Sequence, residues 1–366
     1  MDMLIEALSR QTIDPQTLDE ATRACSPALD ELWKTTPIRD SIAKNDVNLA
    51  EQLRGTADAI RESSDAVLVV AGRSEGAAIR AALSAIEKKD GSPEVTVTGT
   101  SLSAAGYAAI FERLDNKRVS LIAVSCSAED LPLRAAYAIL KAYVFKSAKR
   151  EGDPARVYAV VADGPGGSRV IARDAAENEY PIIRLPENTD PRFTANTAAV
   201  LLPFMVKGGD VREYIRAFGE TVASPEWDGD GTVTAYLMSR ASVRLFETWQ
   251  VEYGDMTRWL ASSGGIAVMM PDDTPVKREI LSRGDLFELM IGSDEGHQDV
   301  MTPLFDGCDP DGSLELLTLS ESERDFFGTE AGQGIKLRAE RADSAACGAL
   351  MAFCQMTLYI ADYLEQ

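Results

Sequence analysis

Five short apolar runs alternate with stretches of helical length between Ala66 and Leu185, and this alternation constrains the fold more than any other feature of the sequence. Each run has the length of one β-strand, and the runs cover residues 66–71, 94–98, 119–124, 157–162 and 182–185. Parallel strands joined by helices form right-handed βαβ units. The sequence therefore predicts a three-layer α/β fold, with a parallel sheet between two layers of helices.

The rest of the chain predicts a second, weaker α/β half with helical segments around both halves. Residues 243–248 and 266–270 are candidate strands of this second half, while residues 193–240 and 343–364 have the pattern of helices. A polar break at residues 187–191 separates the halves. This interpretation gives a helical arm (1–60), a first α/β domain (61–190), a helical connection (191–240), a second domain (241–330) and a C-terminal helical segment (331–366).

The net charge of −21 limits the partners of this chain. A strongly acidic surface repels nucleic acid and anionic membranes, so we expect neither as a partner. A phosphorylated ligand would need a local cation or a cluster of hydrogen-bond donors. No apolar run approaches the ~18 residues of a membrane span, and the acidic start lacks the features of a secretory signal, so we expect a cytoplasmic protein.

The cysteines and short motifs predict neither a metal site nor a cofactor. The five cysteines form no C-x-x-C pair, and Cys347 and Cys354 share one helix face, which favours buried free thiols. Asp309-Pro-Asp-Gly312 lacks the spacing of a calcium loop. Gly164-Pro-Gly-Gly167 lacks the lysine and hydroxyl residue of a nucleotide-binding loop.

Several segments, in order along the chain, resemble one enzyme family. They are Gly99-Thr-Ser-Leu-Ser103 (the family's G-N-N-L-S), Ser125-Cys-Ser127 (S-K-S-G-T-T-T-E-P), Lys141 (a helical lysine), Asn188–Thr194 (G-G-R-F-S), Leu201-Leu-Pro203 with Gly209-Asp-Val (L-L-P and G-I-D-I), Gly284–Ile291 (G-E-R-T-L-F-E-T-V-I) and Gly348–Leu364 (the family's last helix). From about residue 66 onward, the set is similar to the phosphoglucose isomerase (glucose-6-phosphate isomerase) family. The resemblance implies two sugar-isomerase (SIS) domains in tandem, the second of them degenerate, and an isologous homodimer.

The family's reaction moves a proton between C2 and C1 to interconvert glucose 6-phosphate and fructose 6-phosphate. It needs a general acid, a carboxylate base, a cation and a phosphate cradle. In the cradle Ser125 and Ser127 remain, but Ala128, Glu129 and Asp130 replace the glycine and threonines that follow. Two carboxylates there would repel a phosphate dianion; alternatively, they simply favour the N-terminus of the following helix.

The residues that would act as base and acid are also replaced. Where the family has E-S-x-G-K, this chain reads Ala261-Ser-Ser-Gly-Gly265, and Pro275 stands at the position of the ring-opening histidine. The one histidine, His297, lies past that position and is expected in a surface loop. The family's terminal lysine would lie beyond the last residue. The carboxylates that could replace the lost base are Asp272, Asp273 and Glu288.

The resemblance leaves Arg192 as the one retained catalytic candidate. Its guanidinium could hold an enediolate or a carboxylate bidentately, or it could form a structural ion pair. Open α/β sheets bind ligands at the carboxyl ends of their strands. We therefore predict a cleft, able to take a sugar phosphate or another small anion, lined by Gly72, Arg73, Ser74, Ser125, Ser127 and Arg192. Arg73 would meet an anion there, whereas Ser74 and Glu75 could equally be a helix cap.

Three functions remain open at this point. The family match implies an aldose–ketose isomerase of sugar-phosphate metabolism. The joint loss of base, acid, lysine and threonines favours a non-catalytic sugar-phosphate-binding or regulatory protein on the same scaffold. The third hypothesis is an isomerase of a different phosphosugar with relocated groups. Its mark would be a carboxylate within hydrogen-bond reach of Arg192 in a closed cleft.

Overall fold

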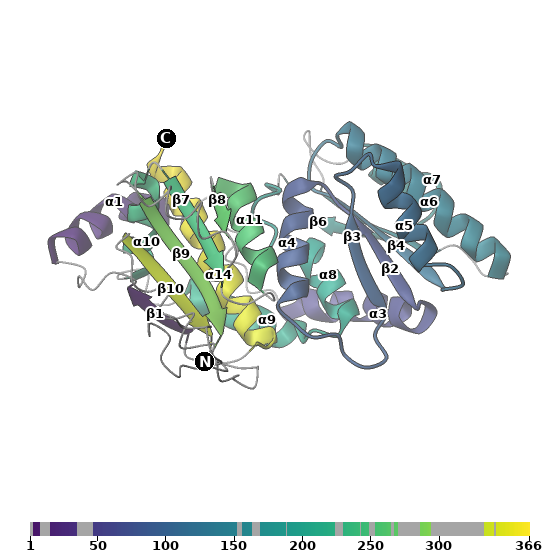
Figure 1. Ribbon diagram of the computed structural model, residues 1–366, viewed down its shortest axis with the longest axis horizontal. Coiled ribbons are helices and arrows are strands. Elements are labelled where there is room, and N and C mark those ends of the chain that lie inside the picture. The colour runs from purple at the N-terminus through teal and green to yellow at the C-terminus, as the bar shows by residue number, and fades with distance from the viewer. Residues whose placement is uncertain are drawn as a thin grey trace, which may run out of the picture.

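Two α/β lobes lie side by side, each built around its own five-stranded sheet (Figure 1). Helix α4 (Arg73–Ser84) of the first lobe packs against α11 (Gly254–Gly264) of the second. The computed structural model describes residues 3–7, 15–34, 47–151, 156–162, 169–187, 189–223, 230–241, 243–248, 253–264, 267–269, 286–293, 333–339 and 342–366.

The first lobe has a fully parallel sheet flanked by helices, as the alternation of the sequence predicts. The spatial order of its strands is β3 (Glu94–Thr98), β2 (Ala66–Val70), β4 (Val119–Ser125), β5 (Arg156–Ala162) and β6 (Ile182–Leu185). β2 and β4 lie in the middle and are buried along their whole length. Burial on both faces explains why their sequences are unbroken apolar runs rather than alternating ones.

Helices cover both faces of this sheet. One face carries α5 (Ala104–Arg113), α6 (Leu131–Glu151) and α7 (Val170–Glu177). The other carries α3 (Val47–Ser63), α4 and α8 (Ala198–Lys207). The face with α4 looks toward the second lobe (Figure 1), so one apolar core continues from β2 through α4 into the second lobe.

Gly99 allows two strand ends to approach each other at the carboxyl edge of this sheet. Its φ is +132°, and a Cβ at this position would lie 2.3 Å from the carbonyl oxygen of Ala71. The backbone N–H of Ala71 also donates to the carbonyl oxygen of Thr98 at 2.9 Å. Any side chain would force these turns apart, so glycine is required where the β2 and β3 turns meet.

The second lobe contains a mixed sheet in the order β1-β10-β9-β7-β8. Its strands are β1 (Met3–Ala7), β10 (Gln333–Ala339), β9 (Leu286–Ser293), β7 (Val243–Thr248) and β8 (Ala267–Met269). β1 runs antiparallel to β10, and the remaining pairs are parallel. The prediction of helix is wrong at β1 and β10, because each is stabilised by a partner far away in the sequence: Met3 pairs with Ala339.

Helix α14 (Ser344–Leu364) is the central helix of the second lobe. It packs against α9 (Val211–Val222), α10 (Asp230–Arg240) and α1 (Pro15–Lys34), and its residues from Ala346 to Ala361 are buried. Among the described residues it is the one helix long and apolar enough to cross a membrane, contrary to the expectation from the sequence. However, 94% of its apolar window is buried inside the protein, so its apolar length is that of a core helix. The buried free thiols include Cys25, Cys126, Cys347 and Cys354, as predicted, and Cys308 lies outside the described residues.

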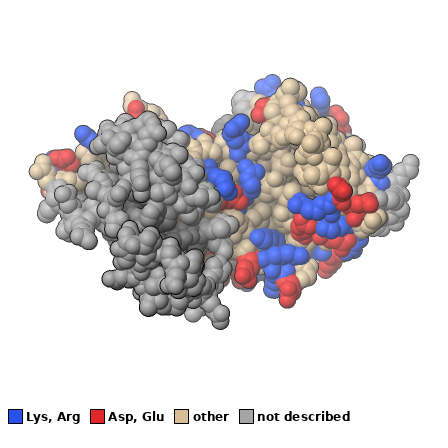
Figure 2. All heavy atoms as spheres, viewed as in Figure 1, with Lys and Arg blue, Asp and Glu red and all other residues tan. Residues whose placement is uncertain are grey.

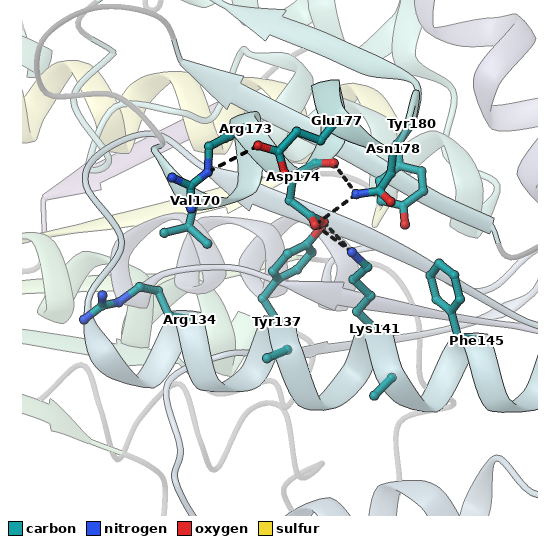
Figure 3. Close-up of a pocket in the computed structure, with 12 residues that line it drawn as sticks. Arg134, Tyr137, Lys141, Phe145, Val170, Arg173, Asp174, Glu177, Asn178 and Tyr180 are labelled. Atoms are coloured by element: carbon teal, nitrogen blue, oxygen red, sulfur yellow. Dashed lines mark hydrogen bonds and ion pairs between the residues drawn. The ribbon is translucent and has the colours of Figure 1, made fainter.

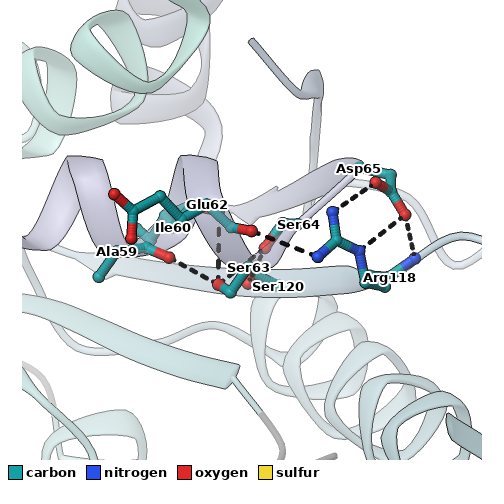
Figure 4. Close-up of polar contacts among 8 residues, drawn as sticks. All are labelled: Ala59, Ile60, Glu62, Ser63, Ser64, Asp65, Arg118 and Ser120. Atoms are coloured by element: carbon teal, nitrogen blue, oxygen red, sulfur yellow. Dashed lines mark hydrogen bonds and ion pairs between the residues drawn. The ribbon is translucent and has the colours of Figure 1, made fainter. Parts of the chain in front are cut away.

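A polar cluster closes the amino edge of the first sheet, opposite to the predicted cleft (Figure 4). Arg118 donates to both carboxylate oxygens of Asp65, with Nη2 2.8 Å from Oδ1, and this pairing lowers the pKa of Asp65. Beneath it, the buried hydroxyls of Ser64 and Ser120 lie 2.5 Å apart. These pairs join the amino ends of β2 and β4. They therefore stabilise the register of the two strands at the edge of the sheet opposite the candidate site.

The contact between α14 and α9 predicts an opposite outcome for two identical substitutions. A Cβ at Gly348 would lie 2.3 Å from the backbone oxygen of Tyr214, whereas a Cβ at the exposed, helical Gly55 would meet nothing within 4 Å. Gly348→Ala should therefore lower the free energy of unfolding by about 1–3 kcal/mol. Gly55→Ala should raise it by up to about 1 kcal/mol, because alanine favours a helix. Urea unfolding of both variants measures the change in the free energy of unfolding. Equal changes in the two variants would contradict the close contact between α14 and α9.

Candidate functional site

The strand order puts the switch point of the first sheet between β2 and β4, which is where a ligand crevice is expected. In the first sheet, β3 lies on one side of β2 and the later strands on the other, so the order reverses between β2 and β4. Open α/β sheets bind ligands at this switch point, outside the carboxyl ends of the strands. Gly72 follows β2, and Arg73 and Ser74 begin α4; Ser125 is the last residue of β4, and Ser127 lies in the turn after it. The fold thus brings these five predicted cleft residues to adjacent strand ends.

The Glu75 carboxyl group lies where this crevice is expected, between the ends of β2 and β4. The side chain is buried, and the backbone N–H of Cys126 donates to its Oε1 at 3.2 Å. A Cβ at Gly72 would lie 2.7 Å from Glu75 Oε2, so the close approach of this side chain requires glycine at position 72. The carboxyl group therefore links the turn after β2 to the turn after β4.

Burial controls the protonation of both groups in this link. It raises the pKa of Glu75, although the backbone N–H groups of Glu75 and Cys126 act in the opposite direction and Asp130 adds a small further rise. Burial also raises the pKa of the Cys126 thiol well above its usual value, and the charges of Glu75 and Asp190 add to this. Cys126 is thus a thiol rather than a nucleophilic thiolate.

Glu129 and Asp130 cap two different helices. Glu129 accepts hydrogen bonds from the backbone N–H groups of Arg169, Val170 and Ile171 at 3.1–3.3 Å, which caps α7. Asp130 Oδ1 accepts from the N–H of Leu133 at 2.9 Å, which caps α6, the following helix. The capping hypothesis is therefore correct for Asp130, whereas Glu129 acts on a more distant helix. Both carboxylates occupy N–H groups that could otherwise bind an anion.

The two serines of the eroded cradle differ in their availability. Ser125 is buried, and its hydroxyl donates to the backbone oxygen of Ser127 at 2.8 Å. Its single O–H is thus used within the turn, so it has only acceptor capacity for a ligand. Ser127 and Ser74 are half-buried and Arg73 is exposed. At the start of α4 the N-cap residue is Gly72, which has no side chain to cap the helix, whereas the Glu75 carboxyl group accepts from its own backbone N–H in the first turn.

Arg192 lies in the connection between β6 and α8, where two carboxylates neutralise it. Its Nη2 is 2.9 Å from Asp190 Oδ2, its Nε is 3.2 Å from Asp190 Oδ1, and its Nη1 is paired with Asp362 near the end of α14. The hydrogen bond with Asp190 is the main cause that raises the pKa of Arg192. Of the two roles considered for Arg192, the structure displays the ion pair, which ties the first lobe to α14.

The carboxylates that the sequence offers in place of the lost base are Asp272, Asp273 and Glu288. Asp272, Asp273, Pro275 and His297 lie outside the described residues. Glu288 lies in β9, where it pairs with Gly334 of β10 and Leu245 of β7, but its side chain is not among those described.

Sequence analysis did not identify Arg80, a cation beside the crevice. Its side chain folds back along α4, so that a Cβ at Gly76 would lie 3.6 Å from Arg80 Nη1. Burial lowers the pKa of Arg80, and the charges of Asp255 and Arg258 on α11 also act on it. Lys and Arg side chains gather over α4 and α11, where the lobes meet (Figure 2). The spacing of Gly76 and Arg80, one helical turn apart, is the sequence signal for this arrangement.

The first lobe has an α/β fold of the SIS type, a five-stranded parallel sheet flanked by helices. No protein-family model matches the chain. The glucose-6-phosphate isomerase of Acetivibrio thermocellus is 26% identical over 169 residues, 44% of this chain and 37% of the relative. Those of Lacticaseibacillus casei (25% over 204 residues, 56% and 41%) and Shouchella clausii (26% over 212 residues, 54% and 46%) are similar. The chain is a distant homologue of the glucose-6-phosphate isomerases, and the match spans less than half the length of these relatives.

Solved structures extend the likeness in fold to nearly the whole chain. A hypothetical protein from Thermus thermophilus superposes with a TM-score of 0.77 at 17% identity, covering 99% of this chain and 95% of that one. A glucose-6-phosphate isomerase from Chlamydia trachomatis superposes with a TM-score of 0.71 at 12% identity, covering 96% and 80%. At such identities these structures show the shared fold alone.

The buried Glu75 predicts a specific pH dependence of stability. Because its pKa is raised in the folded protein, its protonated form stabilises the fold below the unfolded-state pKa, and this contribution is lost as the pH rises through the folded-state pKa. Glu75→Gln keeps the shape and cannot ionise. Its free energy of unfolding relative to the wild type should therefore increase as the pH rises from about 4, the ordinary pKa of glutamate, through the raised pKa of Glu75.

Urea unfolding at a series of pH values measures this difference. Glu112→Gln, on the exposed surface of α5, is the control for a charge removed without burial. A Glu75→Gln variant whose relative stability falls as the pH rises would show that the crevice prefers the ionised carboxylate.

Proposed function

We propose that this chain is a glucose-6-phosphate isomerase-like protein of sugar-phosphate metabolism that has lost isomerase catalysis and serves as a non-catalytic protein on the same scaffold. The observation that carries the proposal is the Glu75 carboxyl group in the switch-point crevice. A ligand phosphate would have to displace a buried side chain of the protein itself. It would also meet Glu129 and Asp130, each of which already uses backbone N–H groups at a helix N-terminus.

The ion pairs of Arg192 support the same proposal. Aldose–ketose isomerisation develops negative charge on an enediolate, and a cation must be free to stabilise it. Asp190 and Asp362 already neutralise Arg192. Binding of an enediolate would require breaking these pairs and leaving two carboxylates without their cation, which costs free energy that the transition state must supply.

Four further features of the expected protein remain proposals. The second sheet, with its parallel strands β10, β9, β7 and β8, is consistent with a degenerate second SIS domain within residues 241–330, although β10 falls in the segment 331–366. The other boundaries (1–60, 61–190 and 191–240) stand as proposed. A homodimer and a cytoplasmic location follow from the resemblance to the family and from the composition.

A second candidate function is the isomerase of a different phosphosugar with relocated groups. It is favoured by one observation: Asp190 and Asp362 lie within hydrogen-bond reach of Arg192, as a relocated base would. Neither carboxylate is one of those expected from the sequence. The half-buried Arg80 would then be the local cation that an anionic substrate needs in a chain of net charge −21.

A coupled assay of fructose 6-phosphate conversion tests the proposed loss of the family's reaction. The wild-type protein should show no turnover above background even at high enzyme concentration, because the crevice is filled and Arg192 is neutralised. Arg192→Ala and Asp362→Asn serve as controls. Turnover by the wild type that both substitutions abolish would overturn the proposal and show that Arg192 and Asp362 take part in the family's reaction.

A further inference from the structure

A concave site lies between α6 and α7, away from the β2–β4 switch point. It is a groove of about 490 Å³ on the face of the first lobe that is turned away from the second lobe (Figures 1 and 3). Its volume is that of a small-molecule site. None of the six predicted cleft residues lines it, so its chemistry is separate from that of the crevice.

The floor of the groove is a closed hydrogen-bonded group. Lys141 Nζ donates to both oxygens of Asp174 at 2.7 and 2.6 Å, and the hydroxyl of Tyr137 donates to Asp174 Oδ2 (Figure 3). Asn178 also donates to Asp174 Oδ1 at 3.1 Å. Because these groups satisfy one another, the floor is close to neutral and is fixed in place without a ligand.

Aromatic rings surround the ammonium group of this floor. Lys141 Nζ lies 5.2 Å from the ring centroid of Tyr180, 5.6 Å from that of Phe145 and 5.9 Å from that of Tyr137. The rings of Phe145 and Tyr180 contact each other edge to face at 6.4 Å. Phe145 remains 42% exposed, which makes it an apolar surface that a ligand could cover at the right-hand end of the groove in Figure 3.

The opposite end of the groove is cationic. Arg134 and Arg173 flank Val170 there (Figure 3). Arg173 lies 3.8 Å from Glu177, with both side chains largely exposed, which makes a weak pair. Arg134 forms no ion pair with any residue in the described part of the chain. Two guanidinium groups at one end match the planar, bidentate geometry of a carboxylate.

The spacing of the two ends defines the shape of a ligand. Arg134 and Phe145 are eleven residues apart on α6, about 16 Å along the helix axis. Ala138 and Ala142 line the groove between them and present only methyl groups. We propose that this groove binds an elongated amphipathic monocarboxylate, with its acid group at Arg134 and Arg173 and its apolar chain over the alanines and Phe145. The groove carries three cations and two carboxylates in a chain of net charge −21, so an anion is the ligand that the local charge favours.

Isothermal titration with decanoate tests the proposal, and three variants on one helix test where it binds. Arg134→Gln should weaken binding by about tenfold or more, because it removes a charge-assisted pair. Ala142→Leu should abolish binding by filling the groove, and leucine at this exposed helical position should not disturb folding. Lys146→Gln, on the same helix but outside the groove, removes the same charge and should leave the affinity unchanged.

Two outcomes would overturn the assignment. One is the absence of saturable decanoate binding by the wild type. The other is binding that Arg134→Gln and Ala142→Leu do not weaken, since it would reflect non-specific uptake on apolar surface. Titration with inorganic phosphate distinguishes a general anion site, because phosphate binding as tight as that of decanoate would show that the apolar part of the groove contributes nothing. Thermal unfolding of each variant confirms that it is folded.

Discussion

A carboxyl group buried at the switch point of a parallel sheet constrains everything around it. Glu75 must find hydrogen-bond donors or lose its charge, because an isolated carboxylate is costly to bury. It accepts the N–H of Cys126, so the turn after β4 has to lie against the turn after β2. Gly72 then has to lack a side chain, and Gly99 brings the β3 turn against the same strand end. The Glu75 interaction and the contact of Gly99 with Ala71 thus account together for the geometry of three neighbouring turns.

The same logic extends to the other charges at this edge. Anion sites in α/β proteins rely on free N–H groups at helix N-termini. Here Glu129 takes those of α7 and Asp130 takes one of α6, while Asp190 and Asp362 hold Arg192. The acidic residues that give the chain its net charge of −21 therefore act locally as internal substitutes for an external anion. Cationic groups remain beside the crevice at Arg80 and, on the far face of the lobe, at Arg134.

The first lobe is predicted well from the sequence because each of its strands and helices can be recognised from a short stretch of neighbouring residues. Each apolar run between Ala66 and Leu185 is a strand followed by a helix or a turn, and the parallel sheet follows from that alternation. β1 and β10 are missed because their pairing joins the two ends of the chain, and a window of neighbouring residues contains no trace of it. The sequence analysis also did not recognise that α14 is long and apolar enough to span a membrane. In the structure this apolar helix fills the core between α9, α10 and α1.

The candidate site is predicted less completely than the fold. The sequence places Gly72, Ser125 and their neighbours at one edge, because strand ends in a parallel sheet meet there. It cannot show that the Glu75 side chain is buried between the strand ends, since a Ser–Glu pair at the start of a helix is also typical of a helix cap. Nor can it show that Arg192 meets Asp362, which is 170 residues away. Such contacts depend on side-chain directions that only the packed structure fixes.

The central claim is that Glu75 fills the place of a ligand phosphate, and one titration tests it most directly. Fructose 6-phosphate is titrated calorimetrically into the wild type and into Glu75→Ser, which shortens the side chain and opens the crevice. The account predicts no saturable heat with the wild type and saturable binding, displaced by inorganic phosphate, with the variant. Saturable binding by the wild type that Glu75→Ser leaves unchanged would contradict it.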